Sequence, residues 1–143
     1  VAVMSDGRFL QVASPAEVYL APEHPDVATF LGSSTLLAGE VGADGRVGSP
    51  LGEVTLTTPL PAGPVTLVAR AEQVHISTAD GAVPGVVDEV SFFGHDATIR
   101  VRLASGEVVT TRVPGLGIPT VGTKVGLEVV GPLVGYPADG PRP

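Results

Sequence analysis

The sequence contains no cysteine and no tryptophan, and only 4% of its residues are aromatic. The absence of cysteine excludes disulfides, thiolate catalysis and cysteine-ligated zinc sites. Since 43% of the residues are nonetheless hydrophobic, the core must consist mainly of Val, Leu, Ile and Ala. No apolar run approaches the roughly 20 residues of a membrane-spanning helix. The sequence also lacks the basic segment followed by an apolar run that is typical of a secretion signal.

Basic residues are also scarce. Eight Lys and Arg stand against 15 Asp and Glu, which gives a formal net charge of −7. Nucleic-acid-binding domains usually present a basic surface, so we expect no nucleic-acid partner. The length of 143 residues fits one domain, or one domain with an appendage. Because the first residue is Val and not Met, we expect the chain to be part of a longer protein.

The first residues carry signals for a hairpin followed by a short helix. Asp6-Gly7 separates two apolar runs, as in a two-residue β-hairpin turn. Ser14 and Glu17 have the spacing of a capping box, and a proline at the first helical position strengthens this prediction. Pro22 disfavours helical geometry in the residue before it, so this helix must be short.

A second short helix is expected to begin at His24, where a proline again follows the capping residue. Gly32 stands where a residue that ends a helix is expected. We place a domain boundary near Ser33. The expected organisation is therefore a hairpin with two helices over residues 1–32 and a β domain over residues 33–143.

After Gly32 the pattern changes to that of short strands. The clearest one covers residues 97–103, in which alternate residues from Ala97 onward are apolar and the others are polar. The 19 Gly and 14 Pro supply frequent turn signals, so the sequence predicts a mostly β domain, either a small barrel or a sandwich. We expect the tail over residues 136–143 to be frayed. The expected strands are 36–41, 54–58, 65–69, 73–77, 85–93, 97–103, 107–113 and 124–130.

Three arginines fall within one expected hairpin: Arg100, Arg102 and Arg112. Arg100 and Arg102 share the polar face of their strand, and Arg112 joins them if its neighbours Thr111 and Val113 point inward. Arginines so close together repel one another unless carboxylates or an anion lie between them. One hypothesis is therefore a small-anion site or docking face. The other is a solvated face balanced by some of the acids.

No arrangement of residues indicates catalysis. The three histidines, His24, His75 and His95, do not have the spacing of metal ligands. We expect a helix cap at the first, a packed or edge residue at the second and a polar turn at the third. Asp88 and Glu89 are adjacent in an expected strand, so their side chains should point to opposite faces, which is unsuitable for a paired-carboxylate site.

The opening run "VAVMSDGRFLQVASPAEVYLAPEHPDVATFLG" resembles the end of the nucleotide-binding domain in the ATPase subunits of bacterial ABC importers. In that family, "IAVM..G.I.Q.G.P.E.IY..P....VA.F.G" leads into a C-terminal regulatory domain called TOBE. Three later runs are similar to TOBE segments. They are "LVARAEQVHIS", with Ala71 where the family usually has Pro, "GVVDEVSFFGHDATIRVRLASGEVVTTRV", and "VGTKVGLEV".

This resemblance implies a small β barrel like an oligonucleotide/oligosaccharide-binding (OB) fold, preceded by the end of the nucleotide-binding domain. It implies a regulatory and dimerising part of an ATP-binding subunit that drives solute import through membrane permease subunits, located in the cytoplasm at the inner face of the membrane. It also implies that this part can bind a regulatory ligand or protein. The chain lacks the family's phosphate-binding loop, Walker B acid, signature motif and switch histidine. We therefore expect no ATPase activity and no cofactor here, with ATP and Mg bound by the domain missing from this chain.

The runs "FFGHDATIRVRL" and "GPLVGYP" look most like the iron(III) branch of the family and the neighbouring polyamine branch, and we expect iron(III). Two other functions stay open. One is a stand-alone oxyanion-binding barrel of the molybdate-binding type. The other is a small β-barrel enzyme, which would need His95, Asp96 and another polar residue to converge in a pocket. We also expect residues 1–12 to pair with a second copy or to pack on the barrel, since a cut strand leaves an exposed edge.

Overall fold

The computed structural model describes residues 1–138. The chain begins with a two-stranded hairpin of β1 (Ala2–Ser5) and β2 (Arg8–Val12), followed by α1 (Pro15–Leu20) and α2 (Pro25–Phe30). The rest of the described chain is almost entirely β. Its elements are β3 (Ser34–Val41), β4 (Val47–Ser49), β5 (Gly52–Val54), β6 (Gly63–Arg70), a 3-10 turn (Ala71–Gln73), β7 (Val74–Ile76), β8 (Val83–Phe92), β9 (Asp96–Leu103), β10 (Val108–Pro114), β11 (Lys124–Val129) and β12 (Val134–Pro137).

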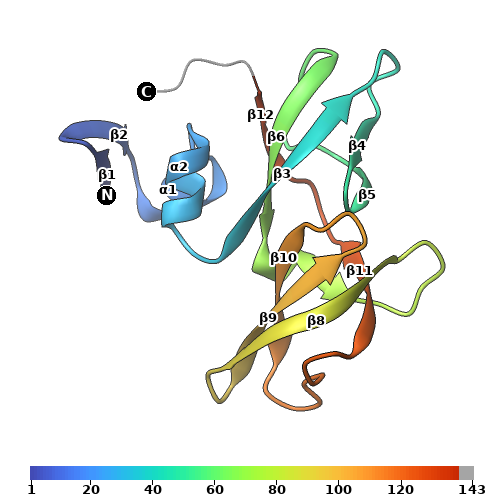
Figure 1. The fold of residues 1–143 in the computed structure, drawn as a ribbon. Helices are drawn as coiled ribbons and strands as arrows, with labels where there is room; N and C mark the ends of the chain where they lie inside the picture. Colours follow the sequence, from blue (N-terminus) through green and yellow to red (C-terminus); the bar gives the residue numbers. More distant parts are fainter. Residues whose placement is uncertain (139–143) are drawn as a thin grey trace.

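The strands after α2 form two five-stranded sheets, in the orders β12-β6-β3-β4-β5 and β10-β9-β8-β11-β7. Both sheets contribute side chains to one hydrophobic core. The second sheet curls until its two edge strands approach each other, and the Thr111 hydroxyl on β10 donates a hydrogen bond to the Val74 carbonyl on β7. The result is a nearly closed β barrel, which confirms the predicted mostly β, OB-like fold (Figure 1).

The alternation in β9 sets which side of this sheet is buried. Ala97, Ile99 and Val101 are fully buried, whereas Arg100 and Arg102 between and after them are exposed. β9 lies between β8 and β10 and pairs antiparallel with both. The buried side of β9 is the one that the sequence pattern predicts, and its pairing with two strands surrounds the inward side chains with apolar neighbours.

The N-terminal hairpin and helices form a separate small cluster with its own core of Val3, Val18 and Val27. Figure 1 shows this cluster to one side of the barrel, next to β3 and β6. The turn follows the prediction, since Asp6 and Gly7 both have positive φ, 50° and 74°, as a two-residue hairpin turn requires. Of the two alternatives expected for residues 1–12, pairing with a second copy stays a prediction, and packing on the barrel is wrong. Their buried side chains lie against α1 and α2 instead.

Both helices begin as their sequences predict. The Ser14 hydroxyl accepts a hydrogen bond from the Glu17 N–H at 3.3 Å, and the Glu17 carboxylate accepts one from the Ser14 N–H at 3.0 Å. These hydrogen bonds hold the pKa of Glu17 below its ordinary value. Nδ1 of His24 accepts from the Asp26 N–H at 3.1 Å, which confirms the histidine cap. Gly32 directly follows Leu31, the C-cap residue of α2, and has a φ of 84°, as predicted for the glycine that ends a helix.

Two expectations about the strands are wrong. Residues 54–58 do not form one strand, because β5 ends at Val54 and the chain then turns toward the β11–β12 connection. There Leu56 forms a parallel bridge with Leu133, and its side chain fills the space beside Gly135. Part of the expected frayed tail is also ordered, since Val134–Pro137 is β12 and pairs with β6. Residues 139–143 of that tail lie outside the described part.

No helix within the described residues 1–138 is long and apolar enough to cross a membrane.

We expect Gly115→Ala to destabilise the barrel by about 1–3 kcal/mol, as overpacking does. A Cβ at Gly115 would lie 2.0 Å from the Gly94 carbonyl oxygen, so the backbone of one loop would have to shift. Gly48→Ala is the matched control, because a Cβ there meets nothing within 4 Å. Urea unfolding of both variants checks this, and equal midpoints would contradict the close approach of the two loops.

Candidate functional site

The structure places all three arginines of the predicted face on the outer side of the barrel. Arg100 and Arg102 are exposed on β9. Arg112 on β10 stands opposite Thr98 in the antiparallel register and is exposed as well. Its neighbour Thr111 is fully buried, as the prediction for this face required. The parity of the two strands therefore brings the three side chains to one surface.

Two of these arginines are paired with carboxylates from β8. The Arg102 guanidinium lies 2.9 Å from an Asp88 carboxylate oxygen, and the Arg100 guanidinium lies 3.6 Å from Glu89. The register of β8 shifts by one residue between Val87 and Glu89, and this β-bulge lets both carboxylates reach the same face. The expectation that Asp88 and Glu89 point to opposite faces is therefore wrong, because it assumed an unbroken strand.

Arg112, like Arg100, is held more loosely than Arg102. Its guanidinium lies 3.5 Å from Asp96 and 3.9 Å from Glu72, both longer than the 2.7–2.9 Å or so of a charge-assisted hydrogen bond. The three arginines therefore do not converge on one point. An anion-binding or docking role for Arg100, Arg102 and Arg112 stays a prediction.

The other histidines lie apart from one another. Nε2 of His75 on β7 is 2.9 Å from the Glu72 carbonyl oxygen. Nε2 of His95 lies 3.4 Å from Asp96 in the exposed β8–β9 turn. Within residues 1–138, no three His, Cys, Asp or Glu side chains are placed to hold a metal ion together.

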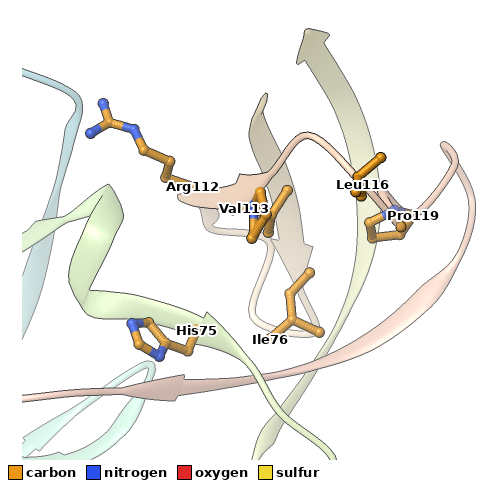
Figure 2. A pocket seen from close by; sticks show the side chains of 8 residues that line it. His75, Ile76, Arg112, Val113, Leu116 and Pro119 are labelled. Atoms are coloured by element: carbon orange, nitrogen blue, oxygen red, sulfur yellow. The ribbon is translucent and has the colours of Figure 1, made fainter. Parts of the chain in front are cut away.

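One pocket, of about 420 Å³, opens between β7, β10 and the β10–β11 loop. Figure 2 shows the side chains of Ile76, Val113, Leu116 and Pro119 gathered around it, with His75 and Arg112 toward one end. The pair His95 and Asp96, which an enzymatic site would need, does not line it. Its lining residues are His75, Ile76, Arg112, Val113, Pro114, Leu116, Gly117 and Pro119.

A fourth arginine, at the end of β6, connects the barrel to the N-terminal cluster. The Arg70 side chain is buried and donates hydrogen bonds to the carbonyl oxygens of Ala28 at 2.7 Å, Tyr19 at 3.0 Å and Leu31. Its guanidinium also lies over the Tyr19 ring, 4.1 Å from the ring centre. We call this group of contacts the Arg70 latch.

The Arg70 latch places a positive charge at the C-terminal ends of both helices. Tyr19 lies in the last turn of α1, while Ala28 and Leu31 lie at the end of α2, where carbonyls lack partners within the helix. Neither helix has a basic residue in its last turn. The positive charge that stabilises the carbonyls at these helix C-termini is therefore supplied by Arg70 of the barrel. Arg70 thus caps two helices at once.

Two tyrosines complete the contact. The Tyr19 hydroxyl donates to the carboxylate of Glu72, which also faces Arg112, and the Tyr136 hydroxyl on β12 donates to the Pro22 carbonyl between the helices. Burial raises the pKa of Tyr136 to about 12, against the opposing influence of Arg70. Burial, followed by the hydrogen bond and charge of Glu72, raises the pKa of Tyr19.

Sequence reasoning missed the latch. Arg70 was quoted within "LVARAEQVHIS" without a role, although it is the only charged residue between Pro64 and Ala71. A lone arginine that directly follows a buried apolar strand was the available signal, since such a residue needs acceptors from elsewhere in the fold.

The architecture defines a small OB-like β barrel with a helical segment docked on its side. Comparison with protein-family models matches residues 67–130 to the TOBE domain. This part of the chain is therefore a TOBE domain, and the chain is related to the ATP-binding subunits of ABC importers.

Two relatives illustrate this. The "Fe(3+) ions import ATP-binding protein FbpC 2" of Rhodococcus jostii is 34% identical over 141 residues, which cover 95% of this chain and 40% of that protein. The "Spermidine/putrescine import ATP-binding protein PotA" of Mesorhizobium japonicum is 32% identical over 142 residues, covering 90% of this chain and 39% of that protein. The chain thus spans about 40% of the length of these relatives.

Among solved structures, the chain resembles the cytoplasmic molybdate-binding protein ModG in a molybdate-bound form. The TM-score is 0.57, and the match covers 72% of this chain and 95% of that one. The sequences are only 16% identical, so the likeness concerns the fold alone.

We expect Arg70→Met to lower the free energy of unfolding by roughly 3 kcal/mol, at about 1 kcal/mol for each carbonyl that loses its partner. Arg100→Met is the matched control. Its exposed pair with Glu89 should contribute less than about 1 kcal/mol. Urea unfolding followed by far-ultraviolet circular dichroism measures both, and equal losses would show that the latch adds nothing beyond an exposed ion pair.

The two tyrosines allow a direct pH test, because the chain has only two Tyr and no Trp. In the folded protein both phenols should ionise above pH 10, and the one with a pKa of about 12 is Tyr136. Since the fold favours the neutral phenols, their contribution to stability is fully present below pH 10 and is lost between pH 10 and about 12. Absorbance at about 295 nm, recorded with and without urea, follows this ionisation. Identical curves would contradict the buried hydroxyls.

Proposed function

We propose that the chain is the regulatory and dimerising part of the ATP-binding subunit of an ABC importer, and that the solute is iron(III). The observation that carries this proposal is the extent of the match, since import ATP-binding proteins align with 95% of the chain and not only with its TOBE domain. The hairpin and helices of residues 1–32 thus belong to the same relationship. Three iron(III) proteins of Rhodococcus jostii align with 95–96% of the chain at 33–34% identity, whereas a polyamine protein of Ruegeria pomeroyi, 36% identical, aligns with 78% of it. The more complete alignment supports iron(III) as the solute.

The Arg70 latch supports a regulatory role. A regulatory domain needs a mechanical connection to the part that it regulates. Arg70 binds both helices of the segment that precedes the barrel, so a displacement of the helices relative to β6 must break buried hydrogen bonds. The latch therefore suits transmission of a movement between the barrel and whatever precedes it.

The chain by itself is proposed to have no ATPase activity. Its sequence has no phosphate-binding loop of the form G-x-x-x-x-G-K-[ST]. ATP and Mg would bind in the part of the subunit that corresponds to the remaining 60% or so of the relatives' length. The proposed partners are a second copy of the subunit and the membrane permease subunits, at the cytoplasmic face of the membrane.

The second candidate is a stand-alone oxyanion-binding barrel, because the molybdate-binding protein ModG has a similar fold. Against it, Arg102 is already hydrogen-bonded to Asp88, and the arginines of this face lie against separate carboxylates without converging on one point. Calorimetry with molybdate, sulfate and phosphate decides between the candidates. Heat that disappears in the Arg100→Ala variant would favour the oxyanion barrel.

A chimera tests the proposed module. The aligned part of Rhodococcus jostii FbpC 2 is replaced by this chain, and we expect the chimera to form a dimer and to restore iron(III) uptake in cells that lack their own subunit. The matched control is the same protein without the replaced part. A chimera that is monomeric and no more active than this control would contradict the regulatory role.

The solute needs a separate test. Deleting the gene in the organism that carries it should reduce uptake of iron(III) and leave uptake of spermidine unchanged. The opposite result would replace iron(III) by polyamine as the solute without affecting the proposed role of the module.

A further inference from the structure

The pocket beside β7 and β10 has an unusual lining for so acidic a chain. Among the described residues, its ionisable lining consists of His75 and Arg112, and no Asp or Glu lines it. The whole sequence has 15 acidic residues against eight Lys and Arg. A pocket that excludes carboxylates from its wall and places a guanidinium at its rim favours an anionic occupant.

The pocket is also divided into two ends. Figure 2 shows the side chains of Ile76, Val113, Leu116 and Pro119 around the apolar part, while Arg112 and His75 lie at the opposite end, with the guanidinium extending outward. Leu116 is 92% exposed, so its side chain forms an apolar lip without being part of the core. The volume of about 420 Å³ lies within the usual range of small-molecule pockets. An occupant that matches both ends has an apolar body and one anionic group.

Arg112 has the donors that such a group requires. Its carboxylate neighbours lie 3.5 Å and 3.9 Å away, and within the part of the chain that the structure describes no hydrogen bond accompanies these pairs. Arg70 and Arg102 differ from Arg112 in this respect. The Arg70 guanidinium donates hydrogen bonds to three carbonyl oxygens, and the Arg102 guanidinium donates one to Asp88 at 2.9 Å. The planar fork of the Arg112 guanidinium can therefore donate two parallel hydrogen bonds to a carboxylate.

We propose that this pocket binds a small organic carboxylate, with the Arg112 guanidinium on the carboxylate and the apolar body against Ile76, Val113 and Leu116. A bare inorganic oxyanion does not fit, since it would leave the apolar wall without a partner. A neutral apolar molecule does not fit either, since it offers the Arg112 guanidinium no hydrogen-bond acceptor. The proposal does not depend on the import function, because it rests only on side chains of the barrel.

An NMR titration of the 143-residue chain tests this, with hexanoate as the probe. Acetate supplies the charge without the apolar body, and 1-hexanol supplies the body without the charge. We expect hexanoate to shift the amide signals of Ile76, Val113 and Leu116, and to bind at least tenfold more tightly than either control compound.

Two variants locate the site. Arg112→Gln should weaken hexanoate binding at least tenfold, while Arg100→Gln, its matched control on the same face, should leave binding unchanged. Leu116→Ser should also weaken binding, and because Leu116 is exposed this variant should fold normally.

Any of three results would overturn the proposal. They are equal affinity for hexanoate and one of the control compounds, unchanged binding in Arg112→Gln, and amide shifts confined to residues outside the pocket. A failed importer chimera together with intact hexanoate binding would instead contradict only the proposed function.

Discussion

The contact between the N-terminal segment and the barrel is centred on one buried side chain, the Arg70 guanidinium. Helices of six residues are too short to persist alone in water, and both helices here end without a basic residue of their own. Arg70 supplies the missing charge and the missing donors from the end of β6. β6 lies inside its sheet, between β12 and β3. An interior strand of that sheet therefore carries the side chain that holds the helices.

The latch and the pocket share a neighbour. Glu72, in the 3-10 turn directly after Arg70, accepts the Tyr19 hydroxyl and faces Arg112 at 3.9 Å. A single carboxylate therefore joins Arg112 on the outer face to Tyr19 of α1. Such a path connects the outer face of the barrel to the segment that, in the import proteins, belongs to a longer subunit.

Local patterns predicted local structure well. The capping box of Ser14 and Glu17, the Asp6-Gly7 turn and the alternation in β9 each depend on residues a few positions apart, and each was confirmed. The errors arose where distant residues decide the outcome. β12 is ordered because it pairs with β6, a partner more than 60 residues earlier in the chain. The bulge in β8 is set by its register against β9, and a single strand's sequence does not specify a register.

The same distinction applies to the candidate site. Parity along β9 and β10 was enough to place Arg100, Arg102 and Arg112 on one face, but the acids that pair with them come from other elements. Arg70 could not be assigned because its acceptors are backbone carbonyls 39 to 51 residues away, and every sequence supplies carbonyls. The resemblance to importer subunits provided the family, whereas the contact between helices and barrel required the fold.

The sequence separation between the contacting residues also determines the order in which these contacts can form during synthesis. The helices are synthesised before the barrel, yet the Arg70 cap lies about 40 residues later, and the hydrogen bond from Tyr136 to Pro22 joins positions 114 residues apart. The hydrogen bonds from Arg70 to the helices can therefore form only after β6 has emerged from the ribosome, and the one from Tyr136 only after β12 has. The contact between α1–α2 and the barrel is thus completed by β12, a strand made more than 100 residues after the helices.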